Sequence, residues 1–262
     1  MTPSILRAFI SLRMDSRLHS SSPIAISLLF LFSVFVWIPA SICHDDLSSS
    51  CSHMFNCGKI NNVGFPFWGV NRPRGCGYPG LELNCESSVT TIDIMNVTYR
   101  VLAVNPDTKT LKISREDYLT GICSPDFANT TLDPTLFDFG SGYQNLTLAY
   151  GCAASWISLL GQFTCPSPMN GTVQINLGVY GPGECEVSVF VPIPTNTIDV
   201  LKIWTLPTLE QVIRDGFEVT WKVDTAACSR DCRGSKGACG YDLQMNRPTC
   251  YPSPGTHSKF SN

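Results

Sequence analysis

Apolar and polar positions alternate in several short stretches of the chain, a pattern typical of β-strands with one buried face. Between residues 97 and 102, Val97, Tyr99 and Val101 occupy every second position, and Leu111 and Ile113 repeat the alternation after an Asn-Pro-Asp-Thr turn at 105–108. These residues predict an antiparallel hairpin. Similar alternation predicts further strands at 146–150, 173–179 and 185–191, so we expect a mainly β protein.

One stretch has helical rather than strand periodicity. Thr208 followed by Gln211 forms a capping-box pattern, Leu209, Val212 and Ile213 make one apolar stripe, and Gly216 stands where an αL C-cap belongs. The sequence therefore predicts one short helix that begins near Thr208 and ends before Gly216.

The first 43 residues have the layout of a secretory signal peptide. Arg7, Arg13 and Arg17 precede an apolar run over 24–37. Small residues favour a cut before His44, with a poorer site after Ala40; the alternative is an uncleaved signal anchor. No later stretch is long and apolar enough to span a membrane, so we expect a secreted product with no transmembrane helix after cleavage.

Cysteine content supports the extracellular prediction. The chain has 13 cysteines, and loss of Cys43 with the signal peptide leaves an even number that can pair completely. They form two groups, which divide the chain into a cysteine-rich module at 44–116, a second β-rich module at 117–250 and a disordered tail at 251–262. We expect disulfides within each group: Cys51, Cys57, Cys76 and Cys85 in the first, and Cys123, Cys152, Cys165, Cys185, Cys228, Cys232, Cys239 and Cys250 in the second.

Charge and sequons narrow the set of partners. Removing three Arg and one Asp with the signal peptide leaves 15 basic and 20 acidic side chains, a net charge of −5, which disfavours nucleic acid as a partner. Four Asn-x-Thr sequons predict N-glycosylation at Asn96, Asn129, Asn145 and Asn170. A glycan marks an exposed surface that does not form a close contact.

The sequence lacks the motifs of common catalytic sites. Only His44, His53 and His257 remain after cleavage, and neither a His-Glu-x-x-His nor a Gly-x-Ser-x-Gly motif occurs. Asp138-Phe-Gly140 copies a kinase tripeptide without the other kinase motifs. The last four cysteines lack zinc-ligand spacing. We therefore expect no catalytic residues, metal or cofactor, although the two carboxylates of a glycosidase would leave no spacing signal.

The segment from Leu47 to Leu81 is the candidate binding region. Its charged residues are all basic, namely Lys59, Arg72 and Arg74, and they are interspersed with aromatic residues, namely Phe65, Phe67, Trp68 and Tyr78. Cations can pair with carboxylates, and aromatic faces can stack on sugar rings. The alternative is that the aromatic residues form the core of a small module while the cations are simply solvated.

Two sets of motifs resemble a known family. Cys51 to Gly58, Val63-Gly-Phe-Pro-Phe-Trp-Gly69, Arg74-Gly-Cys-Gly77 and Leu81-Glu-Leu-Asn-Cys85 resemble the galacturonan-binding module of plant wall-associated receptor kinases. The later motifs are similar to the C-terminal module of these kinases: Tyr150-Gly-Cys152, Phe163-Thr-Cys165, Gly216 to Trp221 and Cys228 to Gly240. With Leu132-Asp-Pro-Thr-Leu-Phe137 between them, the order is that of leaf-rust-resistance-type receptor-like kinase ectodomains.

This resemblance implies a non-enzymatic ectodomain that binds pectin or galacturonan in the plant cell wall or apoplast, with other receptor ectodomains as further partners. Family members are anchored in the plasma membrane, but the transmembrane helix and kinase of the family are absent from this sequence. The family's Cys-x-Cys ending is also replaced after Cys250 by Tyr251-Pro252. The alternative function is recognition of a protein or peptide without useful affinity for pectin.

Overall fold

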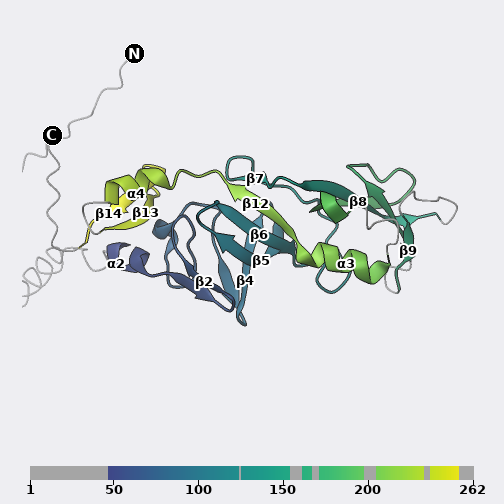
Figure 1. Cartoon of the computed structure of the whole chain (residues 1–262), viewed down its shortest axis with the longest axis horizontal. Coiled ribbons are helices and arrows are strands. Elements are labelled where there is room, and N and C mark those ends of the chain that lie inside the picture. The colour runs from purple at the N-terminus through teal and green to yellow at the C-terminus, as the bar shows by residue number, and fades with distance from the viewer. Residues whose placement is uncertain are drawn as a thin grey trace, which may run out of the picture. The chain divides into compact units, whose positions relative to one another are not determined.

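The computed structural model describes residues 47–123, 125–153, 161–166, 171–197, 205–232 and 237–253. The predicted signal peptide lies outside these residues. The chain divides into two compact units, 1–44 and 45–262, and the described residues all belong to the second. They form four antiparallel sheets with short helices (Figure 1), which confirms the prediction of a mainly β, disulfide-rich protein.

The largest sheet has six strands in the order β3-β4-β5-β6-β12-β7. Its hairpin of β5 and β6 confirms the first predicted strand pair, and Asn105 fixes the turn by accepting the backbone N–H groups of Asp107 and Thr108 at 3.0 and 3.3 Å. The strands are β3 (Asn84–Glu86), β4 (Val89–Ile94), β5 (Val97–Asn105), β6 (Thr110–Arg115), β12 (Phe217–Trp221) and β7 (Phe137–Phe139).

Strand β12 joins this sheet from a distant part of the sequence. It lies between β6 and β7 (Figure 1), with Phe217 opposite Ile113 and Val219 opposite both Leu111 and Phe139. Trp221, at its end, is buried in the same core. The sheet thus contains strands from both sides of the boundary that the sequence predicts at residue 116.

A second sheet has the order β11-β8-β10-β9 and its own apolar core. Three of its strands, β8, β10 and β11, confirm those predicted from alternation, although their bounds differ by a few residues, and β9 was not predicted. They are β8 (Tyr143–Cys152), β9 (Gln162–Thr164), β10 (Thr172–Leu177) and β11 (Val187–Pro194). Leu209 and Ile213 of helix α3 (Leu206–Asp215) are buried in this core, as the apolar stripe predicts.

The predicted start of α3 is wrong. The helix begins at Leu206 with Thr205 as N-cap, so Thr208 lies inside the first turn. Pro207 explains the earlier start, because its fixed φ suits a first helical turn. Gly216 is the C-cap, with φ 70° and its N–H donated to the Ile213 carbonyl, but its ψ of −166° is not αL.

Two further helices were not predicted. They are α2 (Leu47–Ser52) and α4 (Ala226–Cys232), and both are too short to show a helical stripe. Each carries disulfide cysteines, Cys51 in α2 and Cys228 and Cys232 in α4. Cross-links therefore contribute to holding these helices in place.

All twelve cysteines after the predicted signal peptide are paired. The bonds are Cys51–Cys76, Cys57–Cys85, Cys123–Cys165, Cys152–Cys185, Cys228–Cys239 and Cys232–Cys250. None joins the two groups, so the prediction of pairing within each group is confirmed.

The last hairpin packs on the first disulfide segment. The hairpin consists of β13 (Ala238–Asp242) and β14 (Arg247–Tyr251), and β13 contacts α2 and the short 3-10 helix η1 (Arg74–Cys76). Ala238 is buried with Cys51 and Cys76. Strand β14 continues one residue into the predicted tail, because Tyr251 pairs with Ala238 in the ladder and its hydroxyl donates to the Tyr241 carbonyl.

Candidate functional site

A tight turn places Lys59 against the main sheet. It connects β1 (Phe55–Cys57) with β2 (Ile60–Val63). Gly58 in this turn has φ 58°, and a Cβ there would lie 2.0 Å from the carbonyl oxygen of Ser88. Only glycine permits so close an approach, since any side chain would clash with that backbone. Thr90 also ties the two elements together by donating to the Cys57 carbonyl at 3.2 Å.

Two basic side chains line the cavity beside this turn. It has a volume of about 350 Å³ and is lined by Lys59, Ile60 and Cys57 from the hairpin and by residues 88–90 and 100–102 from the sheet. Lys59 is exposed and Arg100 is half-buried, and the lining contains no acidic residue. We call it the cationic cavity.

Arg100 was missed by the sequence prediction because it lies outside the 47–81 segment. The guanidinium group donates from Nε and Nη2 to Glu116 at 3.1 and 2.7 Å, which leaves Nη1 without a partner among the described residues. Strand alternation could have identified it, because Arg100 lies on the face opposite to the buried Tyr99 and Val101.

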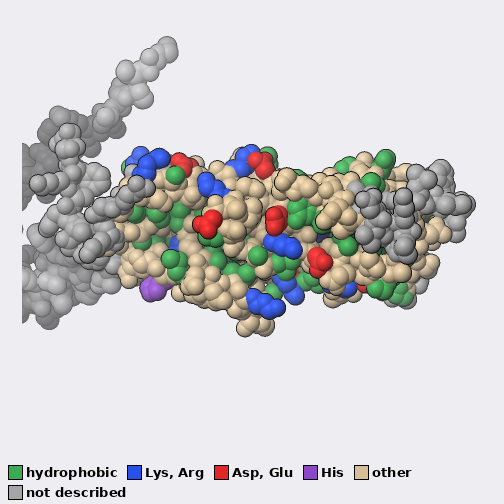
Figure 2. All heavy atoms as spheres, viewed as in Figure 1, with side chains coloured by type: hydrophobic (Ala, Val, Ile, Leu, Met, Phe, Trp, Pro, Cys, Tyr) green, Lys and Arg blue, Asp and Glu red, His purple; other side chains and the backbone are tan. Residues whose placement is uncertain are grey.

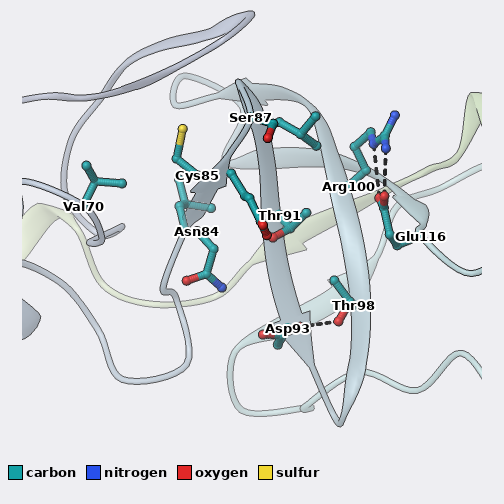
Figure 3. A pocket seen from close by; sticks show the side chains of 12 residues that line it. Val70, Asn84, Cys85, Ser87, Thr91, Asp93, Thr98, Arg100 and Glu116 are labelled. Atoms are coloured by element: carbon teal, nitrogen blue, oxygen red, sulfur yellow. Dashed lines mark hydrogen bonds and ion pairs between the residues drawn. The ribbon is translucent and has the colours of Figure 1, made fainter.

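A larger cavity of about 770 Å³ lies over β3, β4 and β5 (Figure 3). Figure 3 shows Arg100 and Glu116 pointing toward one another on one side and Asp93 accepting from Thr98 on the other. Its lining includes Glu86, Asp93 and Glu116 against the single Arg100. The excess of carboxylates makes this cavity unsuitable for a polyanion.

Arg72 is a structural residue rather than a surface cation. It is 1% exposed, and its guanidinium donates to the backbone carbonyls of Phe67, Cys51, Cys76 and His53. Burial lowers its pKa to about 10, so it remains protonated at neutral pH. We call this arrangement the arginine cage. Both interpretations of Arg72 from the sequence, as a cation that binds a ligand and as a solvated cation, are therefore wrong.

Arg74 is exposed in η1 and lines none of the cavities described in this section. The structure thus separates the three cations of the candidate segment. Lys59 faces a cavity, Arg72 is buried, and Arg74 lies on the surface. The shared binding face that the sequence suggested is not formed by these three side chains alone.

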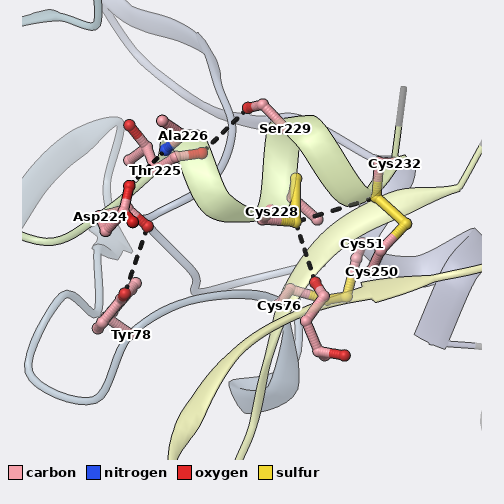
Figure 4. The surroundings of a disulfide bond; sticks show 12 residues. Cys51, Cys76, Tyr78, Asp224, Thr225, Ala226, Cys228, Ser229, Cys232 and Cys250 are labelled. Atoms are coloured by element: carbon pink, nitrogen blue, oxygen red, sulfur yellow. Dashed lines mark hydrogen bonds between the residues drawn. A yellow bond between two sulfur atoms is a disulfide. The ribbon is translucent and has the colours of Figure 1, made fainter.

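The aromatic residues of the segment are mostly packed. Phe67 is 1% exposed and meets Trp221 edge-on at 5.0 Å. The Trp68 indole N–H donates to the Tyr78 carbonyl at 2.9 Å. Tyr78 lies 4.7 Å from the Tyr241 ring, and its hydroxyl donates to the Asp224 carbonyl (Figure 4). These contacts support the core interpretation for Phe67, Trp68 and Tyr78.

Phe65 instead lines a third cavity, of about 260 Å³. Its walls are Asn61, Asn62, Val63, Gly64, Phe65, Pro66, Phe67, Val104, Pro106 and Trp221. None of these residues is charged. We call it the aromatic cavity.

Three predicted sequons can be placed. Asn96 is exposed in the turn between β4 and β5, Asn129 is exposed and accepts the Phe190 N–H at 3.1 Å, and Asn145 is half-buried in β8. Asn170 lies outside the described residues. Glycosylation itself stays a prediction.

Three cysteine sulfurs lie close together at the end of α4. The Sγ atoms of Cys228, Cys232 and Cys239 are within 4.8 Å of one another. All three are in disulfides, and an oxidised cystine is not the thiolate that zinc requires. The proximity reflects two neighbouring bridges.

The visible surface has no single charged patch. Figure 2 shows basic and acidic side chains scattered singly over the described residues on that face. Among the described residues, no helix is both long and apolar enough to cross a membrane.

Two family models match separate parts of the chain. Residues 51–115 match the family model for the wall-associated receptor kinase galacturonan-binding segment, and residues 168–255 match the wall-associated receptor kinase C-terminal model. No solved structure matches.

Similar full-length proteins are receptor-like kinases of Arabidopsis thaliana. Leaf rust 10 disease-resistance locus receptor-like protein kinase-like 2.4 is 38% identical over 84% of this chain and 35% of its own length. The like 2.8 protein is 35% identical over 86% of this chain and 25% of its own. This chain thus spans about a third or less of these relatives. By these matches, the chain belongs to the family of wall-associated and leaf rust 10-type receptor kinase ectodomains.

Proposed function

We propose that this chain is a non-enzymatic extracellular domain that binds galacturonan, the acidic polysaccharide of the plant cell wall. The observation that carries the proposal is the cationic cavity, which lies within the segment that matches the galacturonan-binding model. Lys59 and Arg100 line it together with no acidic residue, and the ion pair of Arg100 with Glu116, which lies outside the lining, leaves Nη1 without a partner among the described residues.

Local charge matters because the protein as a whole is acidic. Without the predicted signal peptide it carries a net charge of −5, so a polyanion is repelled on average. A carboxylate of the polymer must therefore bind where basic side chains outnumber acidic ones. Lys59 supplies an exposed ammonium group, and the half-buried Arg100 supplies a guanidinium held by Glu116. Charge-assisted hydrogen bonds to a uronate carboxylate are the expected contacts.

The test uses the secreted chain and polygalacturonate. We expect binding that weakens as salt rises from about 50 to about 500 mM, where screening shortens the reach of surface charge to a few ångströms. Full methyl-esterification of the polymer should also weaken binding, because it removes the carboxylate charge. Binding that is insensitive to both changes would favour protein or peptide recognition instead.

Paired variants locate the site. Each exposed ion pair contributes about 0.2–1 kcal/mol, so Lys59→Gln with Arg100→Gln should weaken binding roughly 2- to 30-fold. Arg230→Gln with Arg247→Gln is the matched control, because it removes the same charge from exposed residues outside the cavity. Equal losses in both pairs would mean that net charge, and not the cavity, governs binding.

The proposed extracellular location depends on cleavage of the predicted signal peptide. N-terminal sequencing of secreted protein should begin at His44. Retention of residues 20–43 in a membrane fraction would instead indicate a signal anchor.

A further inference from the structure

The sequon at Asn96 lies in a tight hairpin turn. Ile94 of β4 pairs with Val97 of β5, so Met95 and Asn96 alone connect the two strands. Both turn residues have positive φ, 51° and 64°, and asparagine is among the residues that such two-residue turns favour. The hairpin therefore fixes the point at which a glycan on Asn96 would be attached.

This turn is next to the cavity of about 770 Å³ over β3, β4 and β5. Thr98, the third residue of the sequon, lines that cavity and donates to the Asp93 carboxylate at 2.6 Å. The two side chains lie at the end of the hairpin nearest the turn (Figure 3). Two residues of a strand span roughly 7 Å, so the inner sugars of a glycan on Asn96 can reach the lining. Asn129 and Asn145 line none of the three cavities.

The lining of this cavity suits an uncharged sugar. The side chains of Asn84, Glu86 and Thr91 line it and make no hydrogen bond to another described residue. Carboxylates accept hydrogen bonds, and amide and hydroxyl groups both donate and accept them, so these side chains match the hydroxyl and acetamido groups of N-acetylglucosamine. Val70, which is 68% exposed, adds apolar surface for the non-polar face of a sugar ring.

We propose that Asn96 carries an N-glycan whose inner N-acetylglucosamine units fold back over β4 and occupy this cavity. The inference depends on glycosylation of Asn96 and is independent of galacturonan binding. The glycan covers Glu86 and Asp93, so this acidic face is not available to a macromolecular partner.

The glycan leaves the cationic cavity accessible. Val89 and Arg100 line both cavities, and on β5 Arg100 is four positions from Asn96, roughly 13 Å along the strand. Lys59 lines only the cationic cavity. The glycan and a bound polysaccharide therefore occupy different ends of the β4–β5 hairpin.

Enzymatic release of the glycan from the native protein tests this arrangement. The secreted chain is produced with high-mannose glycans, and peptide mass spectrometry measures how much of Asn96 is modified. Endoglycosidase H cuts between the two inner N-acetylglucosamine units, so it can act only on molecules in which these units have left the cavity. We expect a glycan on Asn96 that is released slowly from the native protein and rapidly after reduction and denaturation.

Filling the cavity should remove the protection. Thr91→Trp places a large ring where the sugars would lie and should speed native release from Asn96 about 3- to 10-fold, the population effect of one net hydrogen bond. Thr220→Trp is the matched control, because Thr220 is also a half-buried threonine of the same sheet and lines none of the three cavities. Its rate should equal that of the wild type. If Thr91→Trp does not fold, Thr91→Arg replaces it, with Thr220→Arg as its control.

Three results would overturn the inference: an unmodified Asn96, equal native release from the wild type and a folded Thr91 variant, or the same acceleration in the Thr220 control. Binding of polygalacturonate is measured separately on the same glycosylated protein. If no polygalacturonate binds while release follows the expected pattern, the proposed function fails and this inference stands. If binding is as expected and release is not, only the inference fails.

Discussion

The arginine cage and the cationic cavity place similar side chains in opposite situations. Arg72 is enclosed by backbone carbonyls, while Lys59 is exposed and Arg100 half-buried beside open space. In the cage, every partner comes from the protein and the charge holds the segment together. In the cavity, donors remain for a ligand. Residue type therefore does not distinguish a structural cation from a binding one, whereas its hydrogen-bond partners do.

Arg72→Met should give the largest effect, by breaking the cage. It leaves buried carbonyl oxygens without donors, at about 1–3 kcal/mol each. Loss of the desolvated charge offsets part of this cost, and we expect a net loss of about 3 kcal/mol, or roughly 6–12 °C in Tm. Thermal unfolding of the oxidised protein measures it.

Arg74→Met is the matched control for that change. Arg74 lies two positions further along the chain and is exposed, so its replacement should change stability by no more than about 0.5 kcal/mol. A folded Arg72→Met variant with unchanged Tm and weakened polygalacturonate binding would return Arg72 to the ligand site.

Glu116→Gln should make the difference between the two regions larger, because it should increase the affinity of the cationic cavity for polygalacturonate. Glu116 holds Arg100 through two hydrogen bonds and competes with an incoming carboxylate for the guanidinium. Neutralising it should tighten polygalacturonate binding about 1.5- to 5-fold, the value of one exposed ion pair. Titration calorimetry at low salt is suitable for this measurement.

Glu86→Gln controls for net charge. Glu86 is exposed and has no ion pair among the described residues, so both variants gain one positive unit. An equal gain in the two would mean that overall charge, rather than release of Arg100, explains the change.

The smallest effect concerns Asp242, a carboxylate whose partners, like those of Arg72, are backbone groups. Asp242 accepts the backbone N–H groups of Met245 and Gln244 at 3.0 and 2.9 Å, and these bonds lower its pKa. Because the folded pKa is depressed, the stabilisation is present above the unfolded value of about 3.9 and is lost as pH falls through the folded value. Asp242→Asn should therefore lower Tm slightly at pH 7 and not at all near pH 2.

Asp107→Asn is the control for Asp242, because no hydrogen bond to its carboxylate is present among the described residues. A Tm difference between wild type and Asp242→Asn that persists unchanged into acid would show that the charge of Asp242 is not what stabilises the turn.

Local patterns in the sequence were sufficient for much of the fold. Alternation identified the β5–β6 hairpin and the strands of the second sheet, because a strand with one buried face repeats every two residues. The even number of cysteines in each group indicated the closed pairing. The start of α3 was misplaced because two threonines, Thr205 and Thr208, both suit an N-cap.

Contacts between distant segments could not be predicted in the same way. Arg72 stands between Asn71 and Pro73, two residue types that are common in exposed turns, yet its acceptors come from positions 51, 53, 67 and 76. Likewise, Trp221 reaches the aromatic cavity only because β12 pairs with β6 across about a hundred residues. The local periodicity of apolar residues cannot predict contacts between such distant segments.

The position of β12 also limits where the chain can be truncated and which parts can be exchanged with another protein. A fragment that ended after β6 would leave the hydrogen-bonding groups of that strand open, and unpaired edges promote aggregation. Gene fusions that exchanged one half for an unrelated one would face the same defect. We therefore expect evolution to retain the two parts of the chain together. A recombinant galacturonan-binding segment should aggregate unless residues 217–221 are supplied, either in the same chain or as a peptide.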